Sequence, residues 1–491
     1  MQDQPQQTPP TGSLFFTIFP SVMLPMFLAV VDQTIVSTAL PAIAANLGSV
    51  ERVSWIVVAY LVAGTIAAPV YGQLRDVYGG KRIMFVALGV FLIGSLLCAS
   101  SVSVEMLALA RVLQGLGGGG LMTLSQALIG ETVPPRERAR YQGYLAGVMV
   151  TSSAFGPVVG GYLTEHFGWR SVFLVNLPLV AIAGLLTLRL VSRPARGQAW
   201  SFDGIGLGLF IAFMVPVLLA LEQLQRMSSG ALPAFVILMA IGLVALYALL
   251  QRERQAPYPL LPISLLSQPT IWRSDALAAC HGAALVSLIA FVPLYLRVVH
   301  GTSAVETGLL LLPLTFGIGT GSMLTGRSVS RTGLTTIFPS IGLIFATASL
   351  VLLALLASRL GLRELGVLLF VTGLFMGTVM GVVQVTVQNA AGSASLGAAS
   401  ASVQLSRSIG AAAGTALVGT VLFAVLSLGD PRSAQVFAAL LGRESVADPS
   451  ILTSAPLRAE IATAFRAAFL TIAGFAAVGM VLAWSIPARR L

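Results

Sequence analysis

The sequence of 491 residues is poor in charge, cysteine and histidine. Only 9% of its residues are charged, against about 25% in soluble globular proteins, and 56% are hydrophobic. The two cysteines, Cys98 and Cys280, lie in apolar stretches and predict no disulfide. The three histidines, His166, His281 and His300, belong to no cluster of metal ligands, and no large soluble domain is evident, so we expect no metal, no cofactor and no enzyme activity. These absences indicate a protein whose main solvent is lipid.

The net charge of +10 comes from 27 arginines and one lysine, Lys81, against 18 acidic residues. In a membrane protein such an excess marks cytoplasmic loops, and it argues here against a nucleic-acid partner. No charged region precedes the first apolar stretch, so a cleavable signal peptide is not expected. The segment nearest to a phosphate-binding loop, Gly80-Lys81, has Arg75 where the first glycine is required, which excludes a nucleotide site of this type.

Fourteen apolar stretches are long enough to cross a bilayer as helices, which requires about 20 residues each. Their continuous hydrophobicity, without the alternation of barrel strands, predicts an all-α integral membrane protein. We place the spans near residues 17–40, 53–73, 82–101, 105–130, 140–163, 172–191, 204–222, 231–250, 275–298, 304–326, 336–357, 363–386, 401–427 and 466–486.

Basic residues predict the orientation of these spans. With the N-terminus in the cytoplasm, the first three inward loops hold nine basic residues and the first three outward loops hold two. Under the positive-inside rule, and with an even number of spans, both termini are cytoplasmic. We therefore expect a multi-pass protein of the cell (inner) membrane with its longest outer loop near 428–465. All five tryptophans fall at or next to a predicted span end, where the membrane interface favours them.

The most informative residue is Asp32, deep inside the first apolar stretch. A carboxylate at such a depth costs about 2.5–3.5 kcal/mol on insertion scales and normally faces a bundle interior or a wet cavity. The fourth span carries Arg111 at a similar depth, followed by Gln114 and a run of glycines. An ion pair or a shared water between Asp32 and Arg111 is one interpretation; an arginine side chain that extends to the outer interface is the other. The glycines allow another helix to approach closely.

The loop after the second span, Gly72 to Arg82, has a weaker copy, Gly326 to Gly333, after the tenth span. If spans seven and eight are set aside, each copy follows the second span of a six-span set. This arrangement predicts two parallel halves with an inserted helical pair. The expected domains are a six-helix bundle over 1–200, the inserted pair and its linkers over 201–265, and a second six-helix bundle over 266–491. Taken alone, the loop is also compatible with an ordinary tight turn.

The fifth span carries Gly156, Pro157, Gly160 and Gly161. Proline removes a helical hydrogen bond and bends the helix, and glycines permit tight contact at the bend. Such a helix suits the hinge between two moving halves.

In combination these segments resemble the major facilitator superfamily, specifically its fourteen-span drug/proton antiporters of the EmrB/QacA type. The resemblance rests on five segments in order: Asp32 to Pro41, Gly72 to Arg82, Arg111 to Gly115, Gly156 to Gly161 and Trp169 to Pro178. It implies the major facilitator fold, proton coupling through Asp32 and Arg111, and an antiporter motif in the fifth span. It also implies a cytoplasmic gate formed by Gly72, Asp76, Gly79, Lys81 and Arg82.

The second-loop segment departs from the family pattern at three positions. Val77 and Gly80 stand where basic residues are usual, and Arg75 stands where a small residue is usual. In the family the aspartate is thought to hold the cytoplasmic side shut against a neighbouring helix end. Asp76 can still do this, because helix N-termini attract anions. The contacts that positions 77 and 80 usually make are in question.

Other polar residues in the spans either line a substrate cavity or form hydrogen bonds between helices. The cavity candidates are Gln33, Thr34, Gln114, His281, Gln384, Gln404 and Arg407. For Asp203, Glu222 and Asp275, which fall at span ends, we expect interfacial positions.

The sequence as a whole predicts a proton-coupled multidrug efflux transporter that works by alternating access of two halves. Its expected substrates are hydrophobic or amphipathic, often cationic, small molecules, and its other partners are protons and the lipid bilayer. The alternative is export of one endogenous lipid, siderophore or metabolite. A periplasmic adaptor is a further candidate partner, for which the loop near 428–465 would be the contact.

Overall fold

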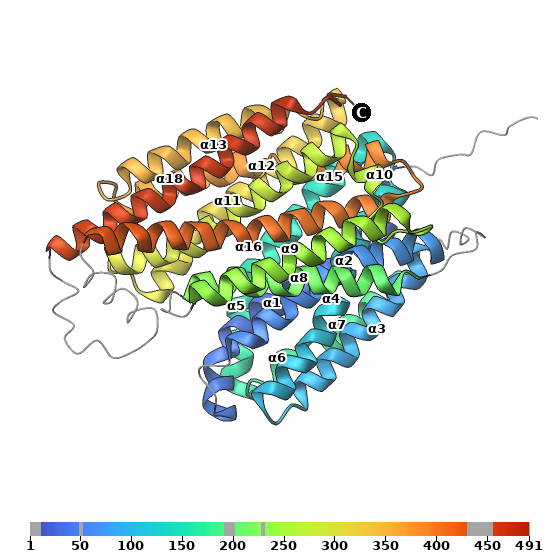
Figure 1. Cartoon of the computed structure of the whole chain (residues 1–491), viewed down its shortest axis with the longest axis horizontal. Coiled ribbons are helices and arrows are strands. Elements are labelled where there is room, and N and C mark those ends of the chain that lie inside the picture. The colour runs from blue at the N-terminus through green and yellow to red at the C-terminus, as the bar shows by residue number, and fades with distance from the viewer. Residues whose placement is uncertain (1–10, 49–52, 191–201, 227–230, 430–454, 491) are drawn as a thin grey trace, which may run out of the picture. The chain divides into compact units, whose positions relative to one another are not determined.

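The structure is a computed structural model that describes residues 11–48, 53–190, 202–226, 231–429 and 455–490 (Figure 1). Within these ranges the regular secondary structure is helical, apart from a single β-bridge between Leu334 and Arg490. The helices are α1 (Thr11–Leu47), α2 (Ser54–Tyr78), α3 (Gly80–Ala99), α4 (Val104–Thr132), α5 (Pro135–Phe167), α6 (Ser171–Leu174), α7 (Asn176–Leu188), α8 (Gly204–Arg226), α9 (Ala231–Gln255), α10 (Ile263–Leu266), α11 (Pro269–Val299), α12 (Ala304–Thr332), α13 (Ile337–Leu356), α14 (Leu362–Met376), α15 (Met380–Ala391), α16 (Leu396–Gly429) and α18 (Ala455–Ser485).

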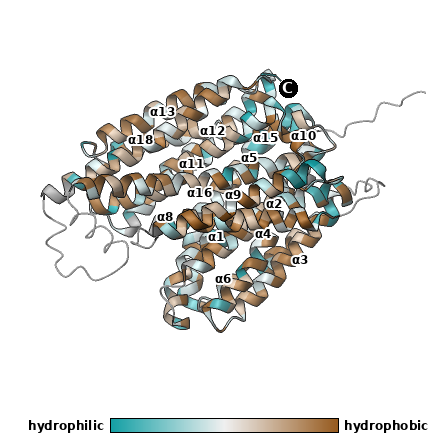
Figure 2. Cartoon of the chain, viewed as in Figure 1, coloured by the Kyte–Doolittle hydropathy of each residue, from teal (hydrophilic) through white to brown (hydrophobic). Residues whose placement is uncertain are grey.

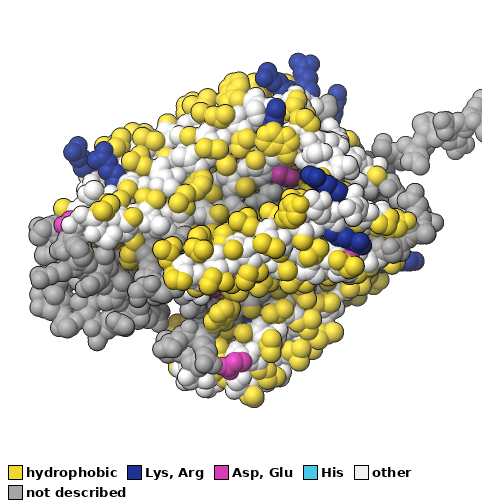
Figure 3. Space-filling model, in the orientation of Figure 1, with side chains coloured by type: hydrophobic (Ala, Val, Ile, Leu, Met, Phe, Trp, Pro, Cys, Tyr) yellow, Lys and Arg dark blue, Asp and Glu magenta, His cyan; other side chains and the backbone are white. Residues whose placement is uncertain are grey.

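Fourteen helical segments of the described chain are long and apolar enough to cross a membrane, which confirms the predicted number of spans. Hydrophobic residues run along most of the helices (Figure 2). They also dominate the face seen in Figure 3, on which charged side chains are sparse. Exposed apolar side chains on this scale fit a protein solvated by lipid.

Two predicted spans are each built from two helices. The sixth comprises α6 and α7, and the twelfth comprises α14 and α15. Pro178 in the first turn of α7 has no N–H to donate, so the helical hydrogen bond it would make to residue 174 is missing where α6 ends. The missing N–H of Pro178 therefore accounts for the division between α6 and α7.

The chain divides into two compact units. The first holds α1 to α4, α6, α7, most of α5 and residues 396–401 of α16; the second holds residues 142–147 of α5, α8 to α15, the rest of α16 and α18. Within the second unit, α8 and α9 pack mainly against each other. The domain boundaries expected from the sequence, with a separate inserted pair, remain a prediction.

The glycine run of α4 brings three helices of the first unit together. A Cβ atom at Gly115 would lie 2.5 Å from the carbonyl oxygen of Tyr60 in α2, and one at Gly117 would lie 2.5 Å from the backbone nitrogen of Phe91 in α3. No side chain fits in these spaces, so α2 and α3 pack directly on the backbone of α4. This confirms the close approach predicted for the glycines.

The two copies of the second-loop segment end their helices in the same way. Gly79 ends α2 with φ 89°, and Gly333 ends α12 with φ 70°. Each follows the first glycine of its copy by seven residues, from 72 to 79 and from 326 to 333. A positive φ favours glycine, which explains why this residue stays the same where the charges differ.

The tryptophans lie at helix ends, as predicted. Trp55, Trp272 and Trp484 belong to terminal turns of α2, α11 and α18, and Trp169 lies between α5 and α6. Trp200 falls outside the described residues.

Candidate functional site

Asp32 lies within α1 and is completely buried. Its Oδ2 accepts a hydrogen bond from Nη1 of Arg111 at 2.5 Å, which is also an ion pair. Its Oδ1 accepts hydrogen bonds from Nε2 of Gln114 and Nδ2 of Asn176, both at 2.7 Å. Helices α1, α4 and α7 thus converge on one carboxylate, and each of its oxygens is satisfied by donors from other helices.

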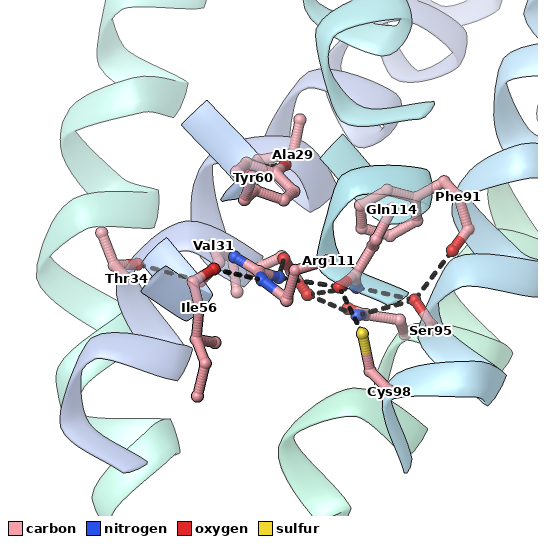
Figure 4. Close-up of polar contacts among 12 residues, drawn as sticks. Ala29, Val31, Thr34, Ile56, Tyr60, Phe91, Ser95, Cys98, Arg111 and Gln114 are labelled. Carbon is pink, nitrogen blue, oxygen red and sulfur yellow. Dashed lines mark hydrogen bonds and ion pairs between the residues drawn. The ribbon is translucent and has the colours of Figure 1, made fainter. Parts of the chain in front are cut away.

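Arg111 is equally buried, with no exposed surface. Its Nε donates to the carbonyl oxygen of Ile56 at 3.3 Å, and its guanidinium lies 4.1 Å from the ring centre of Tyr60 (Figure 4). The Tyr60 hydroxyl donates to the carbonyl oxygen of Ala29 at 3.0 Å, which fixes the ring. The interpretation that Arg111 extends to the outer interface is wrong, because Asp32 and the Tyr60 ring hold the guanidinium inside the first unit.

A second layer of polar groups orients Gln114 (Figure 4). Its Oε1 accepts from Nη1 of Arg111 at 2.7 Å and from Sγ of Cys98 at 3.3 Å, and its Nε2 also donates to Oγ of Ser95 at 2.8 Å. Ser95 in turn donates to the carbonyl oxygen of Phe91 at 2.9 Å. Because Arg111 and Gln114 are three residues apart in α4, they face the same side of the helix and act on Asp32 together.

Asn176 and Ser95 were not predicted as site residues. Asn176 lies within one of the five recognised segments, but a neutral amide in an apolar span has many structural roles. Its Oδ1 has no hydrogen-bond partner among the described residues, although the side chain is buried. This oxygen is one of several buried acceptors in the described chain that accept no hydrogen bond.

The fifth-span glycines pack against α1 one turn beyond Asp32. A Cβ atom at Gly156 would lie 2.6 Å from Cβ of Thr34, and one at Gly160 would lie 2.7 Å from the carbonyl oxygen of Ile35. The Thr34 hydroxyl donates to the carbonyl oxygen of Val31 at 3.0 Å. Gly161, by contrast, has open space where a side chain would stand, and Pro157 is exposed. Two members of this motif therefore make the helix contact.

Asp76 binds the start of a helix, as the sequence led us to expect. Its two carboxylate oxygens accept hydrogen bonds from the backbone nitrogens of Gly397 at 2.9 Å and Ala398 at 3.1 Å, in the first turn of α16. The partial positive charge of a helix N-terminus favours such an anion. Gly72 permits the contact, since a Cβ atom there would lie 2.9 Å from the carbonyl carbon of Gly397.

The structure shows how this segment tolerates its departures from the family pattern. Arg75 donates from Nη1 to Oδ1 of Asp76 at 2.6 Å and from Nη2 to Oε2 of Glu131 at 2.5 Å. A Cβ atom at Gly80 would lie 2.6 Å from Cδ2 of Leu128 and 3.3 Å from Oε2 of Glu131, so the space at position 80 is filled by α4. Arg75 thus supplies a cation to Asp76 and Glu131, five positions before Gly80, where the family usually has a basic residue.

Lys81 and Arg82 differ in their surroundings. Nζ of Lys81 donates to the carbonyl oxygen of Leu188 at 2.7 Å, at the end of α7, where a cation complements the helix dipole. Arg82 is exposed.

The cavity candidates of the second unit are mostly buried. A ring nitrogen of His281, Nε2, lies 3.0 Å from the carbonyl oxygen of Met376, an arrangement that matches the helix-packing alternative for this residue. Nε of Arg407 donates to Oε1 of Gln404 at 3.4 Å, and Gln384 is 2% exposed. In the first unit, Gln33 is half-buried, whereas Gln114 belongs to the Asp32 site.

Asp203 and Asp275 were expected at the membrane interface, which stays a prediction; both side chains are buried within the second unit. Asp203 precedes α8, where its Oδ1 accepts from the backbone nitrogen of Gly206 at 2.9 Å and from Nη2 of Arg252 at 3.1 Å. Burial alone raises the pKa of this carboxyl group, but the hydrogen bonds from Gly206 and Arg252 together lower it below its usual range. The pair ties the start of α8 to the end of α9.

The family model described as Major Facilitator Superfamily matches residues 22–415. The chain belongs to the major facilitator superfamily. It is a membrane transporter of this family and not an enzyme. Its fourteen spans and its relatives named as multidrug or efflux pumps agree with the fourteen-span drug-efflux members.

Three similar proteins illustrate the match. An uncharacterised MFS-type transporter of Mycobacterium tuberculosis is 33% identical over 475 residues, which cover 95% of this chain and 68% of that protein. The multidrug transporter protein MdtP of Bacillus subtilis is 29% identical over 404 residues, or 82% of this chain and 74% of that protein. The solved structure of the human organic anion transporter MFSD10 shares the fold with a TM-score of 0.67 at 15% identity, covering 97% of this chain and 100% of that one.

Proposed function

We propose that this transporter exports hydrophobic or amphipathic, often cationic, compounds in exchange for protons, and that Asp32 is the proton-binding group. The observation that carries the proposal is the ion pair between Asp32 and Arg111, completely buried in the first unit. Ionisable residues inside the membrane are costly and mark ion or substrate pathways. The relatives named as multidrug or efflux pumps support the direction of transport and the substrate class.

Protonation of Asp32 changes the balance of charge at the site. In the ionised form the carboxylate compensates Arg111; in the protonated form the guanidinium is left buried without a counter-charge, which is strongly unfavourable. The helices that carry the two residues then favour another arrangement. The free Oδ1 of Asn176 supports this step, because rotation of the amide would present an acceptor to the protonated carboxyl group.

Substrate and proton compete for the same negative charge. A cationic substrate near Asp32 replaces part of the interaction between Asp32 and Arg111. A proton that enters down the membrane potential binds Asp32 and displaces the substrate. Each proton that moves across 100 mV supplies about 2.3 kcal/mol. A free energy of that size shifts an equilibrium between two conformations by roughly fiftyfold.

Asp76 is the gate residue in this proposal. Its hydrogen bonds to the first turn of α16 hold one conformation, and their loss releases it. The gate lies on the cytoplasmic side of an inner-membrane protein whose termini are both cytoplasmic, an orientation supported by the basic residues of the first loops.

The test is transport by purified protein in liposomes with an imposed pH gradient, together with drug susceptibility in a host that lacks its own efflux pumps. Wild type is expected to accumulate lipophilic cations only when the gradient is present and to protect the host. Asp32→Asn is expected to do neither, although the same variant should still exchange substrate without a gradient. Equal gradient-driven transport by wild type and Asp32→Asn would exclude Asp32 as the proton site.

A further inference from the structure

A second buried carboxylate, Asp275, lies near the start of α11 in the second unit and plays no part in the proposed proton exchange. Its side chain accepts one hydrogen bond, from the hydroxyl of Ser402 in α16 at 3.3 Å. Within the described part of the chain, no basic side chain forms an ion pair with it. An ionised carboxylate with such poor compensation is expensive to bury.

The neighbouring cations on the same two helices are engaged elsewhere. Arg273 donates to the backbone carbonyl of Ser485 and lies 5.3 Å from the ring centre of Trp272. Arg407 donates to the side chain of Gln404. Neither arginine therefore pairs with Asp275.

This charge faces a cavity of about 340 Å³. Drug-sized ligands occupy pockets of about 300 to 1,000 Å³, lined mainly by apolar and aromatic side chains with a few polar anchors. The walls come from the segment before α10, from α10, from α11 and from α16, and they are largely apolar. Their larger apolar side chains are Leu261, Leu266, Trp272, Leu405 and Ile409.

Small residues bring α11 and α16 into direct contact next to the cavity. A Cβ atom at Gly410 would lie 2.5 Å from Cα of Ala279, and one at Gly414 would lie 2.5 Å from Cα of Ala283. The backbones of α11 and α16 are therefore in direct contact beyond the cavity and cannot close it by moving closer together.

We propose that this cavity is a second binding site, separate from Asp32, for a hydrophobic organic cation of the ammonium or phosphonium class. Asp275 provides the counter-charge, and the apolar walls with the Trp272 ring contact the rest of the ligand. A hard metal ion does not suit the site, because calcium takes six to eight oxygen ligands and the cavity offers one carboxylate with two serine hydroxyls, Ser402 and Ser406. An anion would meet the uncompensated carboxylate and be repelled.

The test is binding of radiolabelled tetraphenylphosphonium, a hydrophobic monocation, to the purified full-length protein in detergent, measured by equilibrium dialysis. Asp275→Asn keeps the volume of the side chain and removes its charge. We expect it to weaken the binding component that belongs to this cavity about tenfold or more and to leave any component near Asp32 unchanged. Asp275→Glu is expected to restore most of the affinity. The matched control is Glu364→Gln, which removes an exposed carboxylate that caps α14, and it should bind as wild type does. Equal affinity in wild type and Asp275→Asn would overturn the proposal.

A variant that keeps the carboxylate provides an independent check. Ser406→Phe places a ring in the cavity beside Asp275, and it should lower the affinity as much as the loss of charge does. Tetraphenylborate has the same shape and the opposite charge, and it should not compete with the phosphonium. Competition as strong as that of unlabelled tetraphenylphosphonium would mean that the walls alone recognise the ligand, contrary to the proposal.

Asp32→Asn separates this inference from the proposed function. That variant should lose gradient-driven export and keep tetraphenylphosphonium binding at Asp275. If binding disappeared in Asp32→Asn and persisted in Asp275→Asn, the cation site would be at Asp32 and this inference would be wrong. The reverse pattern supports a site at Asp275 even if Asp32 proves to have no role in proton exchange.

Discussion

Arg75 and Glu131 form an ion pair of 2.5 Å that joins the last turn of α2 to the last turn of α4. Both side chains are nearly buried, with 5% and 9% of their surfaces exposed. The same guanidinium also contacts Asp76, which in turn binds the first turn of α16. One arginine, at a position where relatives usually have a small residue, thus supports the gate segment.

Arg75→Ala is expected to lower both export and stability. It removes the Arg75 cation from the buried Glu131 carboxylate, and removal of one partner of a buried pair costs about 3–5 kcal/mol. The measurements are thermal unfolding in detergent and transport in liposomes. Arg82→Ala, in the same loop but exposed, should stay close to wild type in both. The exchanged pair Arg75→Glu with Glu131→Arg should recover part of the stability that each single change removes. Independent, additive losses would contradict a direct pairing.

The ion pair of Asp32 and Arg111 predicts that removal of both charges restores stability but not transport. Asp32→Asn alone leaves a buried guanidinium unpaired and should destabilise the protein by about 3–5 kcal/mol. Asp32→Asn combined with Arg111→Gln removes both charges, and it should regain most of that stability while gradient-driven transport stays absent. Unfolding midpoints and liposome transport on the same preparations test this. If the double variant were no more stable than the single one, the charges would not form the pair seen here.

The fifth-span motif predicts different effects at two of its glycines. Gly156→Ala places a methyl group against Thr34 of α1, and overpacking of this kind costs typically about 1–3 kcal/mol. Gly161→Ala meets open space and should be neutral or slightly stabilising, since alanine is the better helix former. The yield of folded protein after gel filtration and its unfolding temperature distinguish the two. Similar losses in both variants would argue for flexibility, and not helix contact, as the role of the motif.

The ionised Asp203 carboxylate is expected to stabilise the folded protein at neutral pH and to lose this effect in acid. Its pKa is lower in the folded protein than in the unfolded chain, so it binds a proton more readily when unfolded. Its stabilising effect is therefore fully present above the unfolded pKa of about 3.9 and is lost as the pH falls through the lower, folded value. The difference in unfolding temperature between wild type and Asp203→Asn should be constant from neutral pH down to mildly acidic pH and shrink only in stronger acid. A difference that grew on acidification would give the opposite sign and refute the assignment.

The spans and the main charged residues were evident from the sequence alone. Hydrophobicity over about 20 residues is a local property, so the fourteen helices needed no tertiary information. Asp32 and Arg111 stood out for the same reason, because a charge inside an apolar stretch is costly wherever the helix lies. Gly79 and Gly333 could be paired because a turn with positive φ leaves a glycine in the sequence.

The partners of these residues depended on the tertiary structure. Asn176 and Ser95 are neutral side chains. Asn176 donates to Asp32, and Ser95 accepts from Asn176, only because α1, α3 and α7 pack together. Arg75 can supply the cation that position 80 lacks because α2 and α4 place Glu131 within its reach. The interfacial position expected for Asp275 stays a prediction. Its burial depends on α16, whose Ser402 it contacts, and hydropathy along the chain does not show such a contact. A sequence shows how costly a charge is in lipid, but only packing decides which group compensates it.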